Sequence, residues 1–403
     1  MLPLTEVFPL DRRAVARRRA TAPPAASRTG PPGGGAYHGP AAARGAARNE
    51  RGWRMAHTVG IKEVARQAGV SVGTVSNVIN RPHMVAEETR ERVQAAIEEL
   101  GYVRSESARQ LRAGQSRIIA LLVLDMTNPF FVDVASGAER VARASDLGVM
   151  LCNSAQSPSE EADYLSLFAE QRVRGVLVTP ADMTGRNITD FRRHQIPFVF
   201  VDRVLPSVEG CSVSVDDVEG GTLAVRHLIE QGHTAVAYVS GPMSLKQCRD
   251  RREGALAALA EAGLEHQSLR QFEAGRLDVP SGREAGARLL ELSPRPTAVF
   301  CANDLLALGV LQALFAAGVK VPGDIALVGY DDIEFAAAAA VPLTSVRQPA
   351  VQMGRQAAEL LLEETGEHSG RHRHQRIVFA PQLVVRESTG GARRGRAAPG
   401  SGL

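Results

Sequence analysis

The chain has 403 residues, 44% of them hydrophobic, and a net charge of +3 at pH 7 with histidine counted as neutral. This length allows two or three domains. No apolar run approaches the ~20 residues of a membrane-spanning helix, so we expect a cytoplasmic protein without a membrane partner. Residues 1–56 hold ten arginines and three acids, a net +7, which leaves −4 for the rest of the chain. Any binding of DNA therefore needs a local patch and a shape fit, because bulk charge does not supply it.

Residues 1–56 are rich in Ala, Arg, Pro and Gly, show no core periodicity, and contain a cluster of helix and strand breakers at 31–35. We expect a disordered tail or a start codon assigned too far upstream, with Met55 as the true initiator. An arginine-rich arm that contacts phosphates is the alternative. A signal peptide is not expected, because no apolar segment follows the arginine run.

The segment that follows has the layout of a helix-turn-helix. Residues 61–68 form a predicted helix, Gly69 allows the turn, and Ser71 is a candidate N-cap for a second helix over 72–79. At helical spacing the second helix has an apolar face and a small, polar face, which suits insertion into a major groove. An ordinary amphipathic helical hairpin is the alternative. The apolar face comprises Val72, Val75, Val78 and Ile79, and the polar face comprises Gly73, Thr74, Ser76 and Asn77.

A third helix is predicted over 87–100, where apolar residues recur at helical spacing. Gly101 can end this helix in the left-handed conformation, and Tyr102 can fold back onto the bundle. Residues 105–113 then form a short, weakly amphipathic segment.

From residue 118 onward, apolar strands alternate with helical stretches. This alternation predicts parallel sheets covered by helices on both faces, the doubly wound α/β class. Such sheets bind ligands at the carboxyl ends of their strands, where several polar clusters fall. The predicted strands are 118–124, 149–153, 175–179, 198–202, 213–215, 236–241, 298–302 and 325–330, and the clusters are 125–131, 153–154, 202–203, 303–304 and 331–332.

The sequence contains no GxxxxGK[ST] or HExxH motif and no GxGxxG after a strand. Cys152, Cys211, Cys248 and Cys301 lack zinc-site spacing and are interpreted as small buried hydrophobes. The segment EHSGRHRH at 367–374 brings together His368, His372 and His374, and we expect a solvated loop there, with a metal site as the weaker alternative. We therefore predict no enzyme, no cofactor and no metal.

Motifs follow one another along residues 57 to 390, from VGIKEVA at 59–65 and GVS at 69–71 through NPFF at 128–131 to GYDD at 329–332. In order and spacing they resemble those of the bacterial lactose-repressor (LacI/GalR) family of transcription regulators. The resemblance implies a three-helix DNA-binding head and a two-lobed domain like the periplasmic sugar-binding proteins. It also implies a homodimer that binds a palindromic operator in double-stranded DNA. The matching motifs are VGIKEVA at 59–65, GVS at 69–71, TVS at 74–76, Asn80, TRERV at 89–93, LGY at 100–102, Ala108-Arg109, Leu111, NPFF at 128–131, VDR at 201–203, Asn303-Asp304 and GYDD at 329–332.

The resemblance sets the expected domain boundaries. The head spans residues 57–103, a hinge helix and linker span 104–116, and the effector-binding and dimerisation domain spans 117–390, before a disordered tail at 391–403. The N-lobe is expected at about 117–214 and 346–370, and the C-lobe at about 215–344 and 376–388. The chain is expected to cross between the lobes near 214–216, 344–348 and 367–376.

The family's DNA-contacting positions map onto the second helix and its surroundings. Gly73 can offer only its backbone, and Asn77 stands where family members often have Arg, which favours adenine over guanine. Leu111 matches a leucine that enters the minor groove from a paired hinge helix. The full predicted set is Ser71, Val72, Gly73, Thr74, Ser76, Asn77, Asn80, Tyr102 and Leu111.

The family's effector positions fall on the polar clusters of the expected cleft. The predicted function is a repressor of carbohydrate uptake or catabolism genes, controlled by a small sugar-like effector. Leu277 stands where many members carry an aromatic platform, which weakens the case for a purine. The alternatives are a nucleobase or sugar-phosphate effector, a ligand-binding protein without operator function, and an enzyme acting on the cleft ligand. The predicted effector-binding residues are Phe130, Phe131, Asp202, Gln247, Arg251, Asn303, Asp331 and Gln348.

These effector positions have structural interpretations too. Asp331 could cap a helix, Arg251 could belong to a solvated run of charges, and Phe131 could lie in the core.

Overall fold

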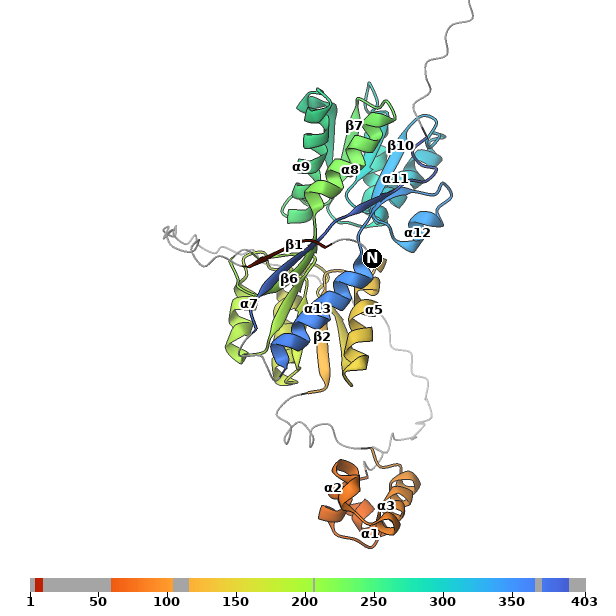
Figure 1. The fold of residues 1–403 in the computed structure, drawn as a ribbon. Helices are drawn as coiled ribbons and strands as arrows, with labels where there is room; N and C mark the ends of the chain where they lie inside the picture. The colour runs from red at the N-terminus through yellow and green to blue at the C-terminus, as the bar shows by residue number, and fades with distance from the viewer. Residues whose placement is uncertain (1–3, 10–58, 104–115, 206, 367–371, 391–403) are drawn as a thin grey trace, which may run out of the picture. The chain divides into compact units, whose positions relative to one another are not determined.

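The computed structural model describes residues 4–9, 59–103, 116–205, 207–366 and 372–390, and for residues 4–9 it describes the backbone alone (Figure 1). The chain divides into two compact units. One comprises residues 12–114 and the other comprises residues 1–11 together with 115–403. Within the described residues, no helix has the length and apolar character needed to cross a membrane.

The smaller unit is the predicted helix-turn-helix with a third helix. Gly69 and Gly101 have φ angles of 66° and 60°, so both turns use the left-handed conformation expected of glycine. The small core contains Val75 and Val78, whereas Val72, which we placed on the same apolar face, is 42% exposed because it lies at the first turn of its helix. The elements are α1 (Ile61–Gln67), α2 (Val72–Asn80), the short 3-10 helix η1 (Pro82–Met84) and α3 (Glu87–Leu100).

The N-cap of α2 yields a first prediction. The Ser71 side chain accepts a hydrogen bond from the Thr74 backbone N–H at 3.0 Å, which satisfies one of the free donors at the helix start. Ser71→Ala should destabilise α2 by about 1 kcal/mol. Amide hydrogen exchange in α2 of the full chain should then speed up by about fivefold. Ser71→Asp, which keeps a capping oxygen, should exchange like the wild type, and equal acceleration in both variants would contradict the capping role.

The first lobe of the larger unit is a seven-stranded sheet in the order β1-β12-β6-β5-β4-β2-β3, parallel except for β1. Its strands are β1 (Leu4–Pro9), β2 (Ile118–Val123), β3 (Gly148–Asn153), β4 (Gly175–Val178), β5 (Phe198–Val201), β6 (Cys211–Val215) and β12 (Gln375–Phe379). Its helices are α5 (Pro129–Ala144), α6 (Pro158–Glu170), α7 (Arg186–Phe191), η2 (Arg192–His194) and α13 (Ala350–Thr365).

Helices cover both faces of this sheet, as the apolar strands predict. Successive side chains of a strand point to opposite faces, so Leu121 packs beneath α5 and α13 while its neighbour Leu122 packs beneath α6 and α7. Both side chains are fully buried. The sheet is thus the middle layer of a three-layer lobe, and its strand ends are the edges left for polar groups.

The second lobe has a six-stranded sheet in the order β13-β11-β10-β9-β7-β8, with β13 antiparallel to β11. Two pairs of helices in this lobe pack closely, α8 against α9 and α10 against α11. A Cβ built on Gly254 of α9 would lie 1.8 Å from the Val218 carbonyl oxygen of α8, so only glycine permits this approach. The elements are β7 (Val236–Ser240), β8 (Leu269–Glu273), β9 (Ala298–Cys301), β10 (Ala326–Asp331), β11 (Thr344–Arg347), β13 (Gln382–Val384), α8 (Asp217–Glu230), α9 (Lys246–Glu261), η3 (His266–Ser268), α10 (Val279–Leu290), α11 (Asp304–Ala316) and α12 (Glu334–Ala337).

The chain passes between the two sheets three times. The first passage follows β6 and the second follows β11, where the sequence placed them. The third lies between β12 and β13, beyond the predicted 367–376, and β12 belongs to the first lobe rather than to the C-lobe segment 376–388. This strand went unrecognised because its polar and basic residues interrupt the apolar pattern, although β6 shields it on one side.

A second difference concerns the N-terminal segment. Residues 4–9, which we assigned to a disordered tail, form β1, which pairs antiparallel with β12 at the sheet edge. Pairing with another strand supplies the backbone partners that the isolated sequence lacks. The rest of the predicted tail, the hinge segment 104–115 and the C-terminal tail lie outside the described residues.

Candidate effector-binding site

All eight predicted effector residues line one cavity between the lobes. Both lobes contribute, since the wall includes the start of α5 in the first lobe and the start of α9 in the second. Most of the lining residues follow the carboxyl ends of strands, as parallel sheets lead one to expect. The cavity wall consists of Leu124, Asp125, Asn128, Phe130, Phe131, Gln156, Asp202, Arg203, Gln247, Arg251, Leu277, Asn303, Asp331 and Gln348.

Two aspartates of the cavity have unusual backbones. Asp202 and Asp331 have φ angles of 67° and 99°, and Asp332 follows with 56°. Non-glycine residues rarely adopt positive φ, and the strain must be supported by the surrounding structure. Asp202 follows β5 in the first lobe and Asp331 ends β10 in the second, so each lobe contributes a carboxylate to the cavity wall.

Asp331 links the two lobes across the cavity. Its two carboxylate oxygens accept hydrogen bonds from Asn128 Nδ2 of the first lobe at 3.0 Å and from Gln348 Nε2 at 2.8 Å. Burial raises the pKa of Asp331, and its positively charged neighbour Arg251 opposes that rise. Asp331 therefore connects groups on both sides of the cavity and does not cap a helix.

Arg251 is held by three protein groups. Its Nε donates to Asp217 Oδ1 at 2.8 Å, an Nη1 hydrogen bond reaches the Ala302 carbonyl, and the guanidinium lies 3.6 Å from the centre of the Tyr330 ring. Only 3% of Arg251 is exposed, so it is not part of a solvated charged run. These contacts hold the guanidinium in place where Arg251 lines the cavity.

Asn303 lines the cavity while also capping α11. Its Oδ1 accepts from the Leu306 backbone N–H at 2.9 Å, and its Nδ2 donates to the Leu277 carbonyl at 3.1 Å. Phe130 and Phe131 are both nearly buried and pack edge to face with ring centres 5.1 Å apart. Each of these three residues therefore combines a structural role with a position in the wall.

Several buried polar atoms of the wall have no hydrogen-bond partner within the described part of the chain. They are the acceptors Gln247 Oε1 and Gln348 Oε1 and the donor Arg203 Nε. Burial, followed by repulsion from Asp217, raises the pKa of Asp202 to about 7, so below that pH its carboxyl group can donate a hydrogen bond. An uncharged ligand carrying both donors and acceptors would satisfy these groups.

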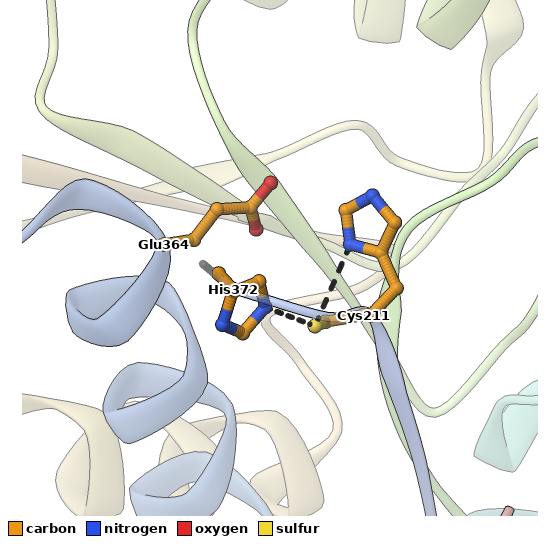
Figure 2. A group of neighbouring side chains, drawn as sticks. Cys211, Glu364 and His372 are labelled. Atoms are coloured by element: carbon orange, nitrogen blue, oxygen red, sulfur yellow. Dashed lines mark hydrogen bonds between the residues drawn. The ribbon is translucent and has the colours of Figure 1, made fainter. Parts of the chain in front are cut away.

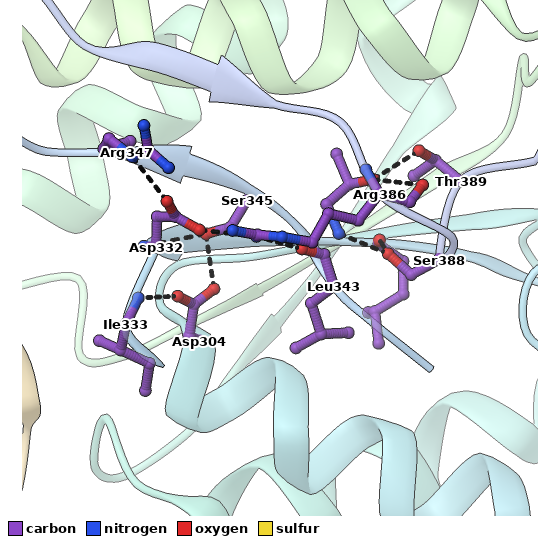
Figure 3. A network of polar contacts seen from close by, with 11 residues as sticks. Asp304, Asp332, Ile333, Leu343, Ser345, Arg347, Arg386, Ser388 and Thr389 are labelled. Carbon is purple, nitrogen blue, oxygen red and sulfur yellow. Dashed lines mark hydrogen bonds and ion pairs between the residues drawn. The ribbon is translucent and has the colours of Figure 1, made fainter. Parts of the chain in front are cut away.

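A polar network fixes the loop that carries Asp331 (Figure 3). The Ile333 backbone N–H and the Ser345 hydroxyl donate to the two oxygens of Asp304, at 2.9 and 2.7 Å. The next carboxylate, Asp332, pairs with Arg347 at 2.7 Å and with Arg386 at 2.6 Å. Buried carboxylates with several partners hold one conformation, so the network maintains the strained backbone at Asp331 and Asp332.

The sequence had not singled out several wall residues as ligand contacts. Asp125, Asn128 and Arg203 belonged to the polar clusters after strands, which was the available signal. Gln156 follows β3 with a φ of 63°, a feature without a sequence signature for glutamine. Asp217 was missed because it acts through Arg251, 34 residues away.

The predicted DNA-reading residues fall into two groups in the smaller unit. Val72, Gly73 and Asn77 are exposed or partly exposed along α2. Ser71 bonds within the helix to Thr74, Asn80 bonds to Ser76, and Tyr102 packs against the small core. The predicted wedge Leu111 lies outside the described residues. Ser71 and Asn80 are exposed as well, so their bonds within the helix do not remove them from the predicted DNA-contacting surface.

A helix-turn-helix unit joined to a two-lobed binding domain defines the class of ligand-controlled transcription regulators. Residues 60–105 match the family described as bacterial regulatory proteins, lacI family, and residues 225–389 match a periplasmic binding protein-like domain. The chain is 36% identical over 332 residues to the HTH-type transcriptional repressor PurR of Photobacterium profundum, covering 81% of this chain and 98% of that protein. The chain belongs to the LacI family of transcriptional regulators.

Solved structures agree with this assignment. The lac repressor dimer bound to operator and the anti-inducer ONPF matches with a TM-score of 0.72 and 27% identity, covering 82% of this chain and 98% of that one. A complex of the transcriptional regulator CelR with cellobiose matches with a TM-score of 0.61 and 33% identity, covering 82% and 100%. These relatives support a DNA-binding repressor with a small-molecule effector.

Proposed function

We propose that this protein is a homodimeric repressor that binds a palindromic operator through α2 and is controlled by a small, uncharged purine base in the cavity between its lobes. The observation that carries the proposal is the convergence of all eight predicted effector residues on a single cavity. The dimer follows from mechanism, since one head reads half of a palindrome. A regulator of transcription acts where the chromosome lies, so we place it in the bacterial cytoplasm.

The sequence left a sugar and a nucleobase open as effector classes, and different relatives favour each of them. Repressors named PurR match nearly their full length, which favours a purine and reverses the preference for a sugar. The unpartnered donor on Arg203 and the unpartnered acceptors on Gln247 and Gln348 suit a flat ring with alternating N–H and C=O groups. A small sugar is the second candidate, because a neighbour of similar fold was solved with cellobiose.

The proposed site controls DNA binding by a difference in affinity between two arrangements of the lobes. A ligand shifts such an equilibrium only as far as it binds one arrangement more tightly than the other. Asn128 and Asp331 form a hydrogen bond across the cavity. We expect this contact to differ between the open and closed arrangements of the lobes. Coupling is reciprocal, so operator DNA should change effector affinity by the same factor as the effector changes operator affinity.

The decisive experiment titrates the full chain onto DNA from its own upstream intergenic region and measures fluorescence anisotropy. Hypoxanthine, guanine, adenine, ribose and cellobiose are added one at a time. We expect one purine base to change operator affinity by about 5–150-fold, the usual range of allosteric coupling. A response only to a sugar would replace the purine by the second candidate, and absence of specific DNA binding would refute the repressor function.

A matched variant identifies the DNA-reading helix in the same assay. Asn77→Ala truncates a polar side chain of α2 and should weaken specific binding more than binding to unrelated DNA. Gln67→Ala, on α1, serves as the control and should leave the ratio of specific to nonspecific affinity unchanged.

A further inference from the structure

Four potential metal ligands gather at the edge of the first-lobe sheet opposite to the effector cavity (Figure 2). Cys211 begins β6, His372 and His374 precede β12, and Glu364 lies near the end of α13. Since β6 and β12 are parallel, their first residues share an edge, and α13 brings its last turn to that edge. The cavity lies at the other ends of these strands.

The separations between the ligand atoms are those of a metal site. Cys211 Sγ lies 3.0 Å from His372 Nε2 and 3.8 Å from His374 Nδ1, and one ligand atom from each of the four residues lies within 4.8 Å of the others. A tetrahedral zinc ion with bonds of about 2.0–2.3 Å separates its ligand atoms by about 3.3–3.8 Å. Small side-chain rotations therefore suffice to close the four ligands on one ion.

A further carboxylate lies near the second ring nitrogen of His372. Its Nε2 faces Cys211, while its Nδ1 lies 3.7 Å from Glu363 Oε2, and only 6% of the His372 side chain is exposed. Histidine ligands commonly have a carboxylate beyond the second ring nitrogen, which fixes the tautomer and the ring orientation. The expected solvated loop is therefore wrong for His372, because the ring packs against a strand 161 residues earlier in the sequence.

Glu364 supplies a carboxylate that the protein itself leaves partly unmatched. Its Oε2 is buried and has no hydrogen-bond partner among the residues that the structure describes. A buried carboxylate oxygen without a donor is costly unless a cation or a proton meets it. Glu364 also lines a hollow beside the cluster, together with His374 and Glu209, which gives an ion a route from solvent.

We infer that Cys211, Glu364, His372 and His374 form a binding site for a zinc-class transition metal ion, independent of the effector cavity. One thiolate and two imidazoles select zinc, cobalt or a similar ion over calcium or magnesium, which prefer oxygen ligands. Binding forms a metal–sulfur bond and releases the Cys211 thiol proton to solvent. The ion would tie α13, β6 and the chain before β12 together, at the edge of the sheet where β2 begins.

Cobalt(II) added to the chelator-treated full chain tests this inference without operator or effector. We expect one equivalent to produce a thiolate-to-cobalt charge-transfer band in the near ultraviolet and visible d–d bands of tetrahedral intensity, both removed by excess zinc. Cys211→Ser should abolish the charge-transfer band. His374→Gln should weaken binding by at least ~100-fold, and Glu363→Gln by about tenfold.

Cys152→Ser is the matched control, since Cys152 is a buried free cysteine of the same lobe that lies outside the cluster. This variant should keep both bands. Circular dichroism of each variant checks folding, and His374→Gln, at a half-buried position, replaces Cys211→Ser if the latter does not fold. Absence of the bands in the wild type, or a charge-transfer band that persists in folded Cys211→Ser, would overturn the metal site.

Discussion

Replacing Arg251 by methionine is expected to lower the free energy of unfolding of the larger unit by about 3–5 kcal/mol, the usual cost of breaking a buried ion pair. Methionine preserves much of the packing volume but leaves Asp217 without its cation in a site that is 8% exposed. Tyr330 also loses the guanidinium that stacks on its ring. Urea unfolding followed by circular dichroism should show the loss as a lower midpoint.

The second half of this experiment separates lost charge compensation from lost packing. Adding Asp217→Asn to Arg251→Met should restore most of the stability, because the amide is uncharged and still offers an oxygen to the Tyr330 hydroxyl. Arg249→Met, an exposed position on the same helix, should cost less than about 1 kcal/mol. If the double variant is no more stable than Arg251→Met, the ion pair is not the cause.

Asp331→Ala is expected to weaken effector binding by about 100-fold or more, since hydrogen bonds to a charged group contribute about 1.5–3 kcal/mol each. The variant removes the carboxylate that faces the cavity and the acceptor shared by Asn128 and Gln348. Isothermal titration calorimetry with the compound that shifts operator affinity measures the loss. Asp190→Ala, at an exposed position of the first lobe, should bind that compound normally. An affinity within threefold of the wild type in Asp331→Ala would exclude Asp331 from the effector site.

The sequence predicted helices and strands wherever apolar residues recur with strong local periodicity. The helices of the smaller unit and the eight strands that the sequence predicted lie within a few residues of their predicted bounds. β8, β11, β12 and β13 were not among the predicted strands. β12 has only three consecutive apolar residues, at 377–379, and its lobe was misassigned because its pairing with β6 and β1 is what makes it a strand. Pairing between distant segments is a tertiary property that a local pattern does not carry.

In the candidate site, too, local sequence patterns were predictive and contacts between distant segments were not. The sequence predicted which polar residues converge, because the carboxyl ends of parallel strands meet at one edge. It could not predict what else those residues contact. The partnership of Arg251 with Asp217, the capping role of Asn303 and the meeting of Cys211 with His372 all depend on packing between segments far apart in the chain.

Gln348 has a consequence for how this regulator can evolve. It contacts Asp331 in the cavity, yet it also lies in the second passage of the chain between the lobes, between the end of β11 and the start of α13. A mutation there changes which molecule is recognised and, at the same time, the flexibility of the connection that transmits recognition. New ligand specificity gained at this position should therefore come with an altered dynamic range of the genetic response. Lineages that changed ligand without losing control would be expected to do so first through Leu277, which lies between β8 and α10 and outside the three connections.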